Sequence, residues 1–138
     1  MSDFVLDASL TLQWFLEYET NREYSVAVLA SLSEKRALVP MLWFYEVGNG
    51  LMMAYRRKRI AFDQIEGFLT RLKGLPIDAA QQTPSEILEL PIVANTRGLT
   101  NYDAAYLALA VGFNSPLATN DSNLRKAAAA ASVSLVAV

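Results

Sequence analysis

Four acidic side chains stand where a parallel α/β sheet would gather them at one edge. Asp7 ends the apolar run FVLDAS, and Asp121 follows a second run, SPLATND. Glu46 and Asp103 lie in the first turns of predicted helices that follow loops. Ligands of open parallel sheets bind outside the carboxyl ends of the strands, so we expect the four carboxylates to meet there.

Carboxylates gathered in this way predict a divalent metal site. Partly buried acids that lie close together repel one another and hold protons unless a cation neutralises them. Hard cations take oxygen ligands, and an all-oxygen set favours Mg²⁺ or Mn²⁺ over zinc. Such an ion orients phosphates, lowers the pKa of bound water and stabilises in-line displacement at phosphorus. The acids therefore indicate metal-dependent phosphate chemistry.

Each acid also has a structural interpretation. Asp7 and Asp121 are candidate caps for the helices that follow them. Glu46 suits the positive end of a helix dipole, and Thr100 with Asp103 fits a capping box in which Asp replaces Glu. The set of four favours chemistry, because neither Glu46 nor Asp103 has a Lys or Arg three or four positions away.

The composition limits the chemistry open to these acids. The 138 residues include no cysteine and no histidine, which excludes disulfides, thiolate zinc sites and imidazole-based catalysis. A net charge of −2 argues against binding nucleic acid by bulk charge, although a local basic patch remains open. No apolar run is long enough to span a bilayer and the N-terminus lacks a basic signal segment, so we expect a cytoplasmic protein without membrane contact.

Short apolar strands alternate with helices along the chain, which predicts a single α/β domain over residues 1–138. Its central parallel sheet should be flanked by helices. The predicted strands are 4–9 (stopping at Asp7), 37–40, 76–79, 115–121 and 133–138. The predicted helices are 11–19, 22–35, 44–59, 62–73, 84–97, 100–111 and 122–131. Pro91 should disturb the fifth of these helices, and Gly98 should end it.

The motifs that carry the acids resemble the PIN domain, and most closely the VapC-type toxin ribonucleases of type II toxin–antitoxin pairs. These motifs are VLDAS, FYEVGNGL, LTNYDAAYLALA and PLATNDSNLRKAA, in the family's order, and the resemblance extends from residue 3 to about residue 136. It implies a three-layer PIN-like (Rossmann-like) fold and an endoribonuclease that leaves a 5′-phosphate and a 3′-hydroxyl. It also implies an RNA substrate, a homodimer and an antitoxin protein that covers the active site.

The resemblance also assigns roles to residues. Catalysis and the binding of one or two Mg²⁺ or Mn²⁺ ions fall to the acidic quartet, Asp7, Glu46, Asp103 and Asp121. Ser9, Asn49 and Thr119 match supporting polar positions beside the acids. Some relatives carry a further acid where this chain has Asn123, which favours one metal ion over two.

Basic and aromatic side chains near the motifs have two interpretations each. The possible RNA-binding residues are Arg56, Arg57, Lys58, Arg59, Arg125 and Lys126. The run 56–59 is otherwise a solvated helix end, and it lies roughly 15 Å from Glu46 along a helix. The aromatic residues are Trp14, Phe15, Trp43, Phe44 and Tyr45. They fit core or dimer packing, base stacking, or a groove for an antitoxin helix.

Two other functions remain open from the residues. One is a catalytically silent PIN-fold module that binds a protein partner or RNA, which the intact quartet disfavours. The other is a different Mg²⁺-dependent phosphotransfer fold. A haloacid-dehalogenase-like phosphatase would need an Asp at Ser9, and a receiver domain would need a Lys soon after Asp121, before Lys126.

Overall fold

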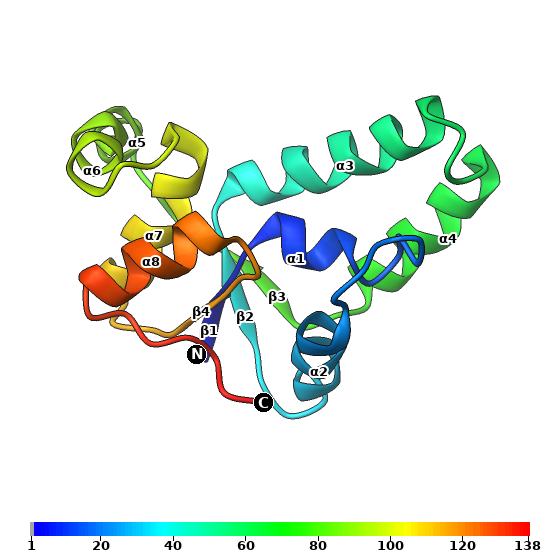
Figure 1. Cartoon of the computed structure of the whole chain (residues 1–138), viewed down its shortest axis with the longest axis horizontal. Coiled ribbons are helices and arrows are strands. Elements are labelled where there is room, and N and C mark those ends of the chain that lie inside the picture. Colours follow the sequence, from blue (N-terminus) through cyan, green and yellow to red (C-terminus); the bar gives the residue numbers. More distant parts are fainter. Residues whose placement is uncertain (1) are drawn as a thin grey trace.

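A parallel sheet of four strands forms the centre of the computed structural model, which describes residues 2–138 (Figure 1). Its strands are β1 (Phe4–Leu6), β2 (Ala37–Val39), β3 (Ile77–Ala79) and β4 (Leu117–Ala118). Their order in the sheet is β3-β2-β1-β4, and each pair of neighbours is parallel. The predicted fold class, a parallel sheet flanked by helices, is confirmed.

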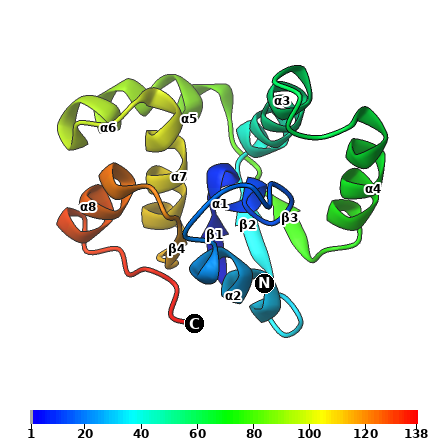
Figure 2. The ribbon, with the colours of Figure 1, turned by 45° about the vertical axis from the view of Figure 1, so that its right-hand side comes forward.

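Helices cover the sheet on both sides. They are α1 (Ala8–Leu12), α2 (Glu23–Ser31), α3 (Met41–Arg56), α4 (Phe62–Lys73), α5 (Pro84–Leu88), α6 (Leu90–Arg97), α7 (Asn101–Gly112) and α8 (Ser122–Ala130). In both views α5 to α8 lie on one side of the molecule, and α3 and α4 lie on the other (Figures 1 and 2). Within residues 2–138, no helix combines the length and apolar character needed to cross a membrane.

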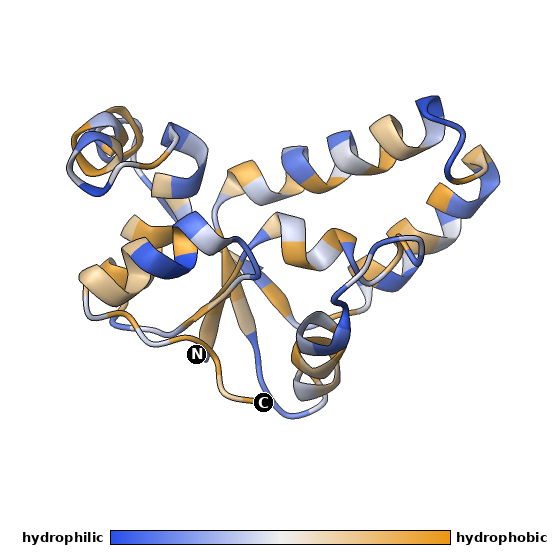
Figure 3. Ribbon diagram, in the orientation of Figure 1, coloured by the Kyte–Doolittle hydropathy of each residue, from blue (hydrophilic) through white to orange (hydrophobic). Residues whose placement is uncertain are grey.

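The core forms around the two inner strands. Every residue of β1 and β2 is buried, as expected for parallel strands that are covered on both faces. Hydrophobic colouring is accordingly concentrated on the strands and on the helix faces that meet them (Figure 3). Helix α7 contributes Ala104, Leu107 and Ala110, which are also buried. Its many small residues let it pack closely on the sheet.

Helices α1 and α3 approach each other closely because Gly50 lacks a side chain. A Cβ atom at Gly50 would overlap the Leu12 Cδ1 atom. The tip of Leu12 therefore occupies the space that any other residue at position 50 would fill. This packing places α1, which follows β1 directly, against the middle of α3.

Several predicted boundaries were wrong at the ends of strands. The predicted strands 4–9 and 115–121 stop at Leu6 and Ala118, and α1 starts at Ala8 instead of residue 11. The predicted last strand, 133–138, makes a single bridge between Leu135 and Leu117. It cannot extend along β4, because β4 has only two residues before the chain turns.

Two helices end where local chemistry requires it. The predicted helix 84–97 is divided at Glu89, because Pro91 has no N–H to donate to the preceding turn. Gly98 ends α6 in the left-handed conformation at a φ of 66°, as predicted. The predicted helix 44–59 instead spans Met41–Arg56, and Lys58 adopts a φ of 61°.

Lys58 closes α3 with a pair of hydrogen bonds typical of a left-handed cap. The Lys58 N–H donates to the Tyr55 carbonyl at 2.9 Å, and the Arg59 N–H donates to the Ala54 carbonyl at 2.9 Å. The basic run therefore leaves the helix after Arg56 and turns back toward the rest of the molecule.

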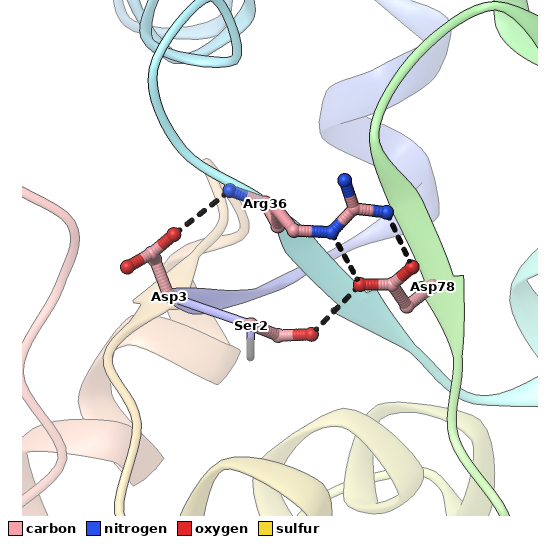
Figure 4. Close-up of polar contacts among 4 residues, drawn as sticks. All are labelled: Ser2, Asp3, Arg36 and Asp78. Atoms are coloured by element: carbon pink, nitrogen blue, oxygen red, sulfur yellow. Dashed lines mark hydrogen bonds and ion pairs between the residues drawn. The ribbon is translucent and has the colours of Figure 1, made fainter.

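An ion pair joins the amino-terminal side of the sheet (Figure 4). The Arg36 guanidinium donates to both carboxylate oxygens of Asp78, at 2.7 and 3.0 Å. The Ser2 hydroxyl also donates to Asp78, and Asp3 accepts from the Arg36 N–H at 2.9 Å. Because the pair is exposed, we expect it to fix the register of β2 and β3 more than to stabilise the fold.

The conformation of Lys58 generates the first prediction. Lys58→Gly should raise the free energy of unfolding by about 0.5–1 kcal/mol, because glycine adopts a positive φ without steric cost. Urea denaturation measures the change. Lys58→Ala is the control, since it removes the charge and keeps the unfavourable backbone. Equal stabilisation by both variants would mean that the charge, and not the backbone, is responsible.

Candidate functional site

The order of the strands places the predicted site between β1 and β4. The chain builds β1, β2 and β3 in one direction and then returns to add β4 on the other side of β1. Ligands of open parallel sheets bind at such a reversal, beyond the carboxyl ends of the strands. Asp7 follows β1, and Thr119 and Asp121 follow β4.

Asp7 is held by donors from both strand ends. Its side chain is only 4% exposed, and its Oδ2 atom accepts hydrogen bonds from the Ser9 and Thr119 hydroxyls, each at 2.7 Å. The Ser9 N–H is also directed at Oδ1, at 3.4 Å, so Asp7 caps α1. Burial raises the pKa of Asp7 above its usual value, the hydrogen bonds oppose this shift, and the charge of Asp121 adds to it.

Glu46 projects from α3 toward α7, where Tyr106 holds it. The Tyr106 hydroxyl donates to Glu46 Oε1 at 2.5 Å, and the tyrosine is only 1% exposed. Partial burial raises the pKa of Glu46, and the charges of Asp7 and Asp103 raise it further. Burial and the Glu46 charge raise the pKa of the Tyr106 phenol, so the hydroxyl remains a donor.

Asp103 and Asp121 stand at the starts of α7 and α8. The N-cap of α7 is Thr100, whose hydroxyl accepts from the Asp103 N–H at 3.1 Å, and Asp103 lines the same pocket as the other three acids. Burial raises the pKa of Asp103, and Asp121 and Asp7 raise it further. Asp121 caps α8 by accepting from the Leu124 N–H at 2.8 Å.

The four acids line one pocket of about 320 Å³, called here the acidic pocket. Its lining residues are Asp7, Ala8, Ser9, Leu12, Glu46, Asn49, Gly50, Asp103 and Asp121. The lining contains no basic side chain. Within residues 2–138, however, no three acids converge closely enough to hold a metal ion with the side chains as they lie. The oxygen donors suit a hard divalent cation, but some carboxylates must rotate to reach one.

The four acids differ in which of the others they interact with. The charge of Asp7 raises the pKa of Glu46 and of Asp103, and the charge of Asp103 raises the pKa of Glu46. Glu46 couples to Asp7 and Asp103, and Asp121 couples to the same two acids. Asp7 and Asp103 each interact with both of the other acids and are called here the central pair, and Glu46 and Asp121 are called the flanking acids.

The predicted supporting polar residues lie in or beside the acidic pocket. Ser9 and Asn49 line it, and Thr119 is fully buried behind it. Thr119 links two of the acids, because its hydroxyl donates to Asp7 and accepts from the Asp121 N–H at 3.0 Å.

The predicted RNA-binding residues lie outside the acidic pocket. Arg125 is engaged within the chain: it donates to the Thr119 carbonyl at 2.7 Å and to Asn120 Oδ1 at 3.2 Å, and its guanidinium stacks on Tyr24. The others are exposed: four lie at or just after the end of α3 and one lies on α8, namely Arg56, Arg57, Lys58, Arg59 and Lys126. A role in binding RNA stays a prediction for all of them.

The predicted aromatic residues divide between core and surface. Trp14, Phe15 and Trp43 are buried in the core, whereas Phe44 is 43% exposed and Tyr45 is 76% exposed. The Trp43 N–H donates to the buried Thr11 hydroxyl, at 3.1 Å. Thr11 in turn donates to the Asp7 carbonyl at 3.1 Å. Trp43 therefore links α3 to the backbone that presents Asp7.

Sequence reasoning missed two residues that hold the site, Tyr106 and Thr11. Tyr106 is three positions after Asp103 in a run of alanines and leucines, so it resembled an ordinary core residue. A phenol on the same helix face as an acid was the available signal, because a buried hydroxyl requires a partner. Thr11 gave no signal of this kind, since its partner Trp43 is distant in the sequence.

Comparisons with known proteins give one family and a consistent fold. Residues 4–130 match the PIN domain model. PAE2754 from Pyrobaculum aerophilum is 25% identical, with a TM-score of 0.69 over 91% of this chain and 84% of that one. No curated protein matches the sequence.

Two further solved structures have lower identity and cover nearly all of both chains. VapBC2 from Rickettsia felis, bound to a DNA fragment from its promoter, is 14% identical, with a TM-score of 0.63 and 96% of each chain covered. FitAcB from Neisseria gonorrhoeae is 16% identical, with a TM-score of 0.51, and covers 97% of this chain and 96% of that one. At these identities the likeness is one of fold.

The raised pKa of Asp103 generates a prediction for stability and pH. Between its usual value of 3.8 and its higher folded value, the folded chain keeps a proton that the unfolded chain has lost. Stability therefore falls as pH rises through this range, and the destabilisation is greater at neutral pH than near pH 4. Asp103→Asn should raise the melting temperature at pH 7, and the gain should shrink as pH approaches 4.

Asp63→Asn is the matched control for this measurement. Asp63 also lies in the first turn of a helix, α4, but it is exposed and far from the acidic pocket in the fold. The control should produce no stabilisation at pH 7. If Asp103→Asn instead lowers the melting temperature, the favourable interaction of Asp103 with its helix dipole outweighs the repulsion.

The hydrogen bond between Tyr106 and Glu46 generates a second prediction for this site. Tyr106→Phe keeps the buried ring and should lower the free energy of unfolding by about 1–2 kcal/mol, because a charged acceptor loses its donor. In a Glu46→Ala background the same change should cost little, since the hydroxyl has already lost its partner. Chemical denaturation of the four proteins gives the coupling energy. Equal costs in both backgrounds would contradict the coupling.

Proposed function

The chain belongs to the PIN domain family, and from this premise we propose that it is a Mg²⁺- or Mn²⁺-dependent endoribonuclease. The observation that carries the proposal is the acidic pocket, where four carboxylates meet and no basic side chain lines the wall. Three of these acids have raised pKa values, so together they pay an electrostatic cost that a cation would remove.

The donor set fits one divalent cation at the central pair of acids. Asp7 and Asp103 would hold it, with Glu46 or Asp121 as the third ligand, and occupation of both flanks would allow a second ion. When bound, the cation supplies charge neutralisation and activates water for attack on a phosphodiester. Ser9, Asn49 and Thr119 are the polar groups available to position water and phosphate oxygens around it.

The surrounding residues of the chain orient the acids for this task. Ser9 and Thr119 fix one oxygen of Asp7, and Tyr106 fixes one oxygen of Glu46. Within residues 2–138 the second oxygen of Glu46 accepts no hydrogen bond and that of Asp7 accepts only the long one from the Ser9 N–H, so both can still bind a cation. Such outer hydrogen bonds typically set the orientation of metal ligands. Arg125 holds the backbone at Thr119 and Asn120, and so steadies the loop that carries Asp121.

We also propose that the chain is the toxin of a type II toxin–antitoxin pair, that it acts in the cytoplasm and that it forms a homodimer. The four motifs resemble VapC-type proteins, and the likeness in fold to VapBC2 supports the same assignment. The partner would be a cognate antitoxin protein. A pocket of unpaired carboxylates suits the insertion of an Arg or Lys side chain from such a partner.

Cleavage of total cellular RNA by the purified protein tests the proposed activity. With Mn²⁺ or Mg²⁺ we expect discrete fragments that carry 5′-phosphates, and with EDTA we expect none. Asp7→Asn should reduce the cleavage rate by at least about 100-fold, because the central ligand is lost. Asp63→Asn is the control, because it removes the same charge outside the pocket and should cleave normally.

Binding of the cation is measured separately from turnover. Mn²⁺ should raise the melting temperature of the wild type and of Asp63→Asn, and should raise that of Asp7→Asn far less. Metal-dependent stabilisation without any cleavage would favour a catalytically silent module that binds RNA or a protein partner. No response to Mn²⁺ and no cleavage would contradict the metal-dependent site itself.

A further inference from the structure

A second cavity, of about 290 Å³, lies between the α1–α2 connection and the α3–α4 pair. It is called here the arginine–aromatic cavity. Its lining residues are Trp14, Phe15, Glu17, Tyr18, Arg59, Ile60, Gln64, Phe68 and Arg71. Two cations and one acid leave the lining with a net positive charge, in contrast to the acidic pocket.

The two arginines of this cavity lie against aromatic rings. The Arg59 guanidinium carbon is 5.1 Å from the centre of the Tyr18 ring, and that of Arg71 is 5.7 Å from the centre of the Phe15 ring. The Phe15 ring, which contacts Arg71, also packs against the Phe68 ring, with the ring centres 4.6 Å apart. Each guanidinium is thus within cation–π distance of an aromatic ring.

Neither of these guanidinium groups is otherwise engaged within residues 2–138. Among the described residues, their side chains donate no hydrogen bond. They also form no ion pair, since the one present joins Arg36 and Asp78. Arg22 and Arg125 differ, because both donate to backbone carbonyls. The N–H groups of Arg59 and Arg71 therefore remain available to a ligand with anionic oxygens.

The chain passes from the acidic pocket to this cavity within a few residues. Leu12, the last residue of α1, lines the acidic pocket, and Trp14, two residues later, lines the arginine–aromatic cavity. The left-handed cap at Lys58 turns the chain after α3 and leads directly into Arg59. The arginine–aromatic cavity lies beyond the C-terminal end of α3, roughly 15 Å along the helix from Glu46, where it can contact RNA that flanks the acidic pocket.

The acidic pocket cannot by itself attract a polyanion such as RNA. Binding of nucleic acid depends on cations that replace counterions around the phosphates, and the four carboxylates oppose this. Unpaired bases also stack on aromatic rings and on guanidinium planes. The arginine–aromatic cavity offers cations and flat surfaces together, which an apolar helix from a protein partner would leave unused.

We propose that the arginine–aromatic cavity binds single-stranded RNA that flanks the bond cleaved in the acidic pocket. Arg59 and Arg71 contact phosphate oxygens through their free N–H groups, and an unpaired base stacks beside Tyr18 and Phe68. The assignment rests on the proposed ribonuclease function for its substrate. It differs from that function in naming a binding site that contains none of the four acids.

The test measures RNA binding under conditions that prevent cleavage. Wild type and the variants Arg59→Gln and Arg71→Gln are titrated, in EDTA, into a fluorescein-labelled single-stranded RNA of mixed sequence, and anisotropy is followed at several salt concentrations. Each variant should bind about five- to tenfold more weakly. The slope of log K against log salt should fall by about 0.7 for each phosphate contact that is lost.

Two controls make the outcome specific. Arg97→Gln removes the same charge from the exposed end of α6 and should bind like the wild type. Arg59→Lys keeps the positive charge but loses the planar guanidinium group. It should therefore keep the slope of log K against log salt and lose part of the affinity for RNA. Thermal melts verify that every variant is folded.

The possible results separate this inference from the proposed function. Weaker RNA binding by Arg59→Gln and Arg71→Gln, with Arg97→Gln unaffected, supports the cavity as an RNA site even if the wild type cleaves nothing with Mn²⁺. If Arg59→Gln and Arg71→Gln bind RNA as tightly as Arg97→Gln does, the inference is overturned, even where the wild type is an active ribonuclease.

Discussion

The buried carboxylate of Asp7 imposes the main constraint on this molecule. It stands at the end of the central strand and no basic side chain lines the pocket around it, so its charge must be compensated by hydrogen bonds or by a cation. The hydroxyls of Ser9 and Thr119 provide part of that compensation. Because Thr119 follows β4, this arrangement requires β1 and β4 to be neighbours whose carboxyl ends are level, which is the register observed.

The other three acids each combine a local structural partner with a position in the shared pocket. Asp121 caps α8, the Asp103 N–H is bonded to Thr100, and Glu46 accepts from Tyr106. These local bonds hold each side chain in place while its charge remains unfavourable for its neighbours. A conflict between local stability and a gathering of like charge is what functional sites commonly contain. The arginine–aromatic cavity contrasts with the acidic pocket, because its lining holds two arginines and one acid.

The sequence was sufficient to predict the fold class and the gathering of the four acids, because strand ends and helix starts in a parallel sheet meet at one edge. It was also sufficient for the disturbance at Pro91 and the left-handed Gly98, since both depend on one residue's backbone chemistry. It failed at the tail 133–138, where the length of β4 decides the pairing, and at α3, where a lysine takes the conformation usual for glycine. Contacts between distant residues, such as Tyr106 with Glu46, have no local pattern.

The two edges of the sheet determine how this chain can associate with others. The edge at β4 is two residues long and is covered by the backbone of residues 134–136. The Leu117 N–H donates to the Ser134 carbonyl, and the Leu117 carbonyl accepts from the Val136 N–H. The edge at β3 is three residues long and carries the charged pair of Asp78 with Arg36. Short, covered and charged edges resist the addition of a foreign strand. We therefore expect this chain to associate with other chains through its helix surfaces. The sheet edges should not add strands from another molecule, which also protects the chain from aggregation.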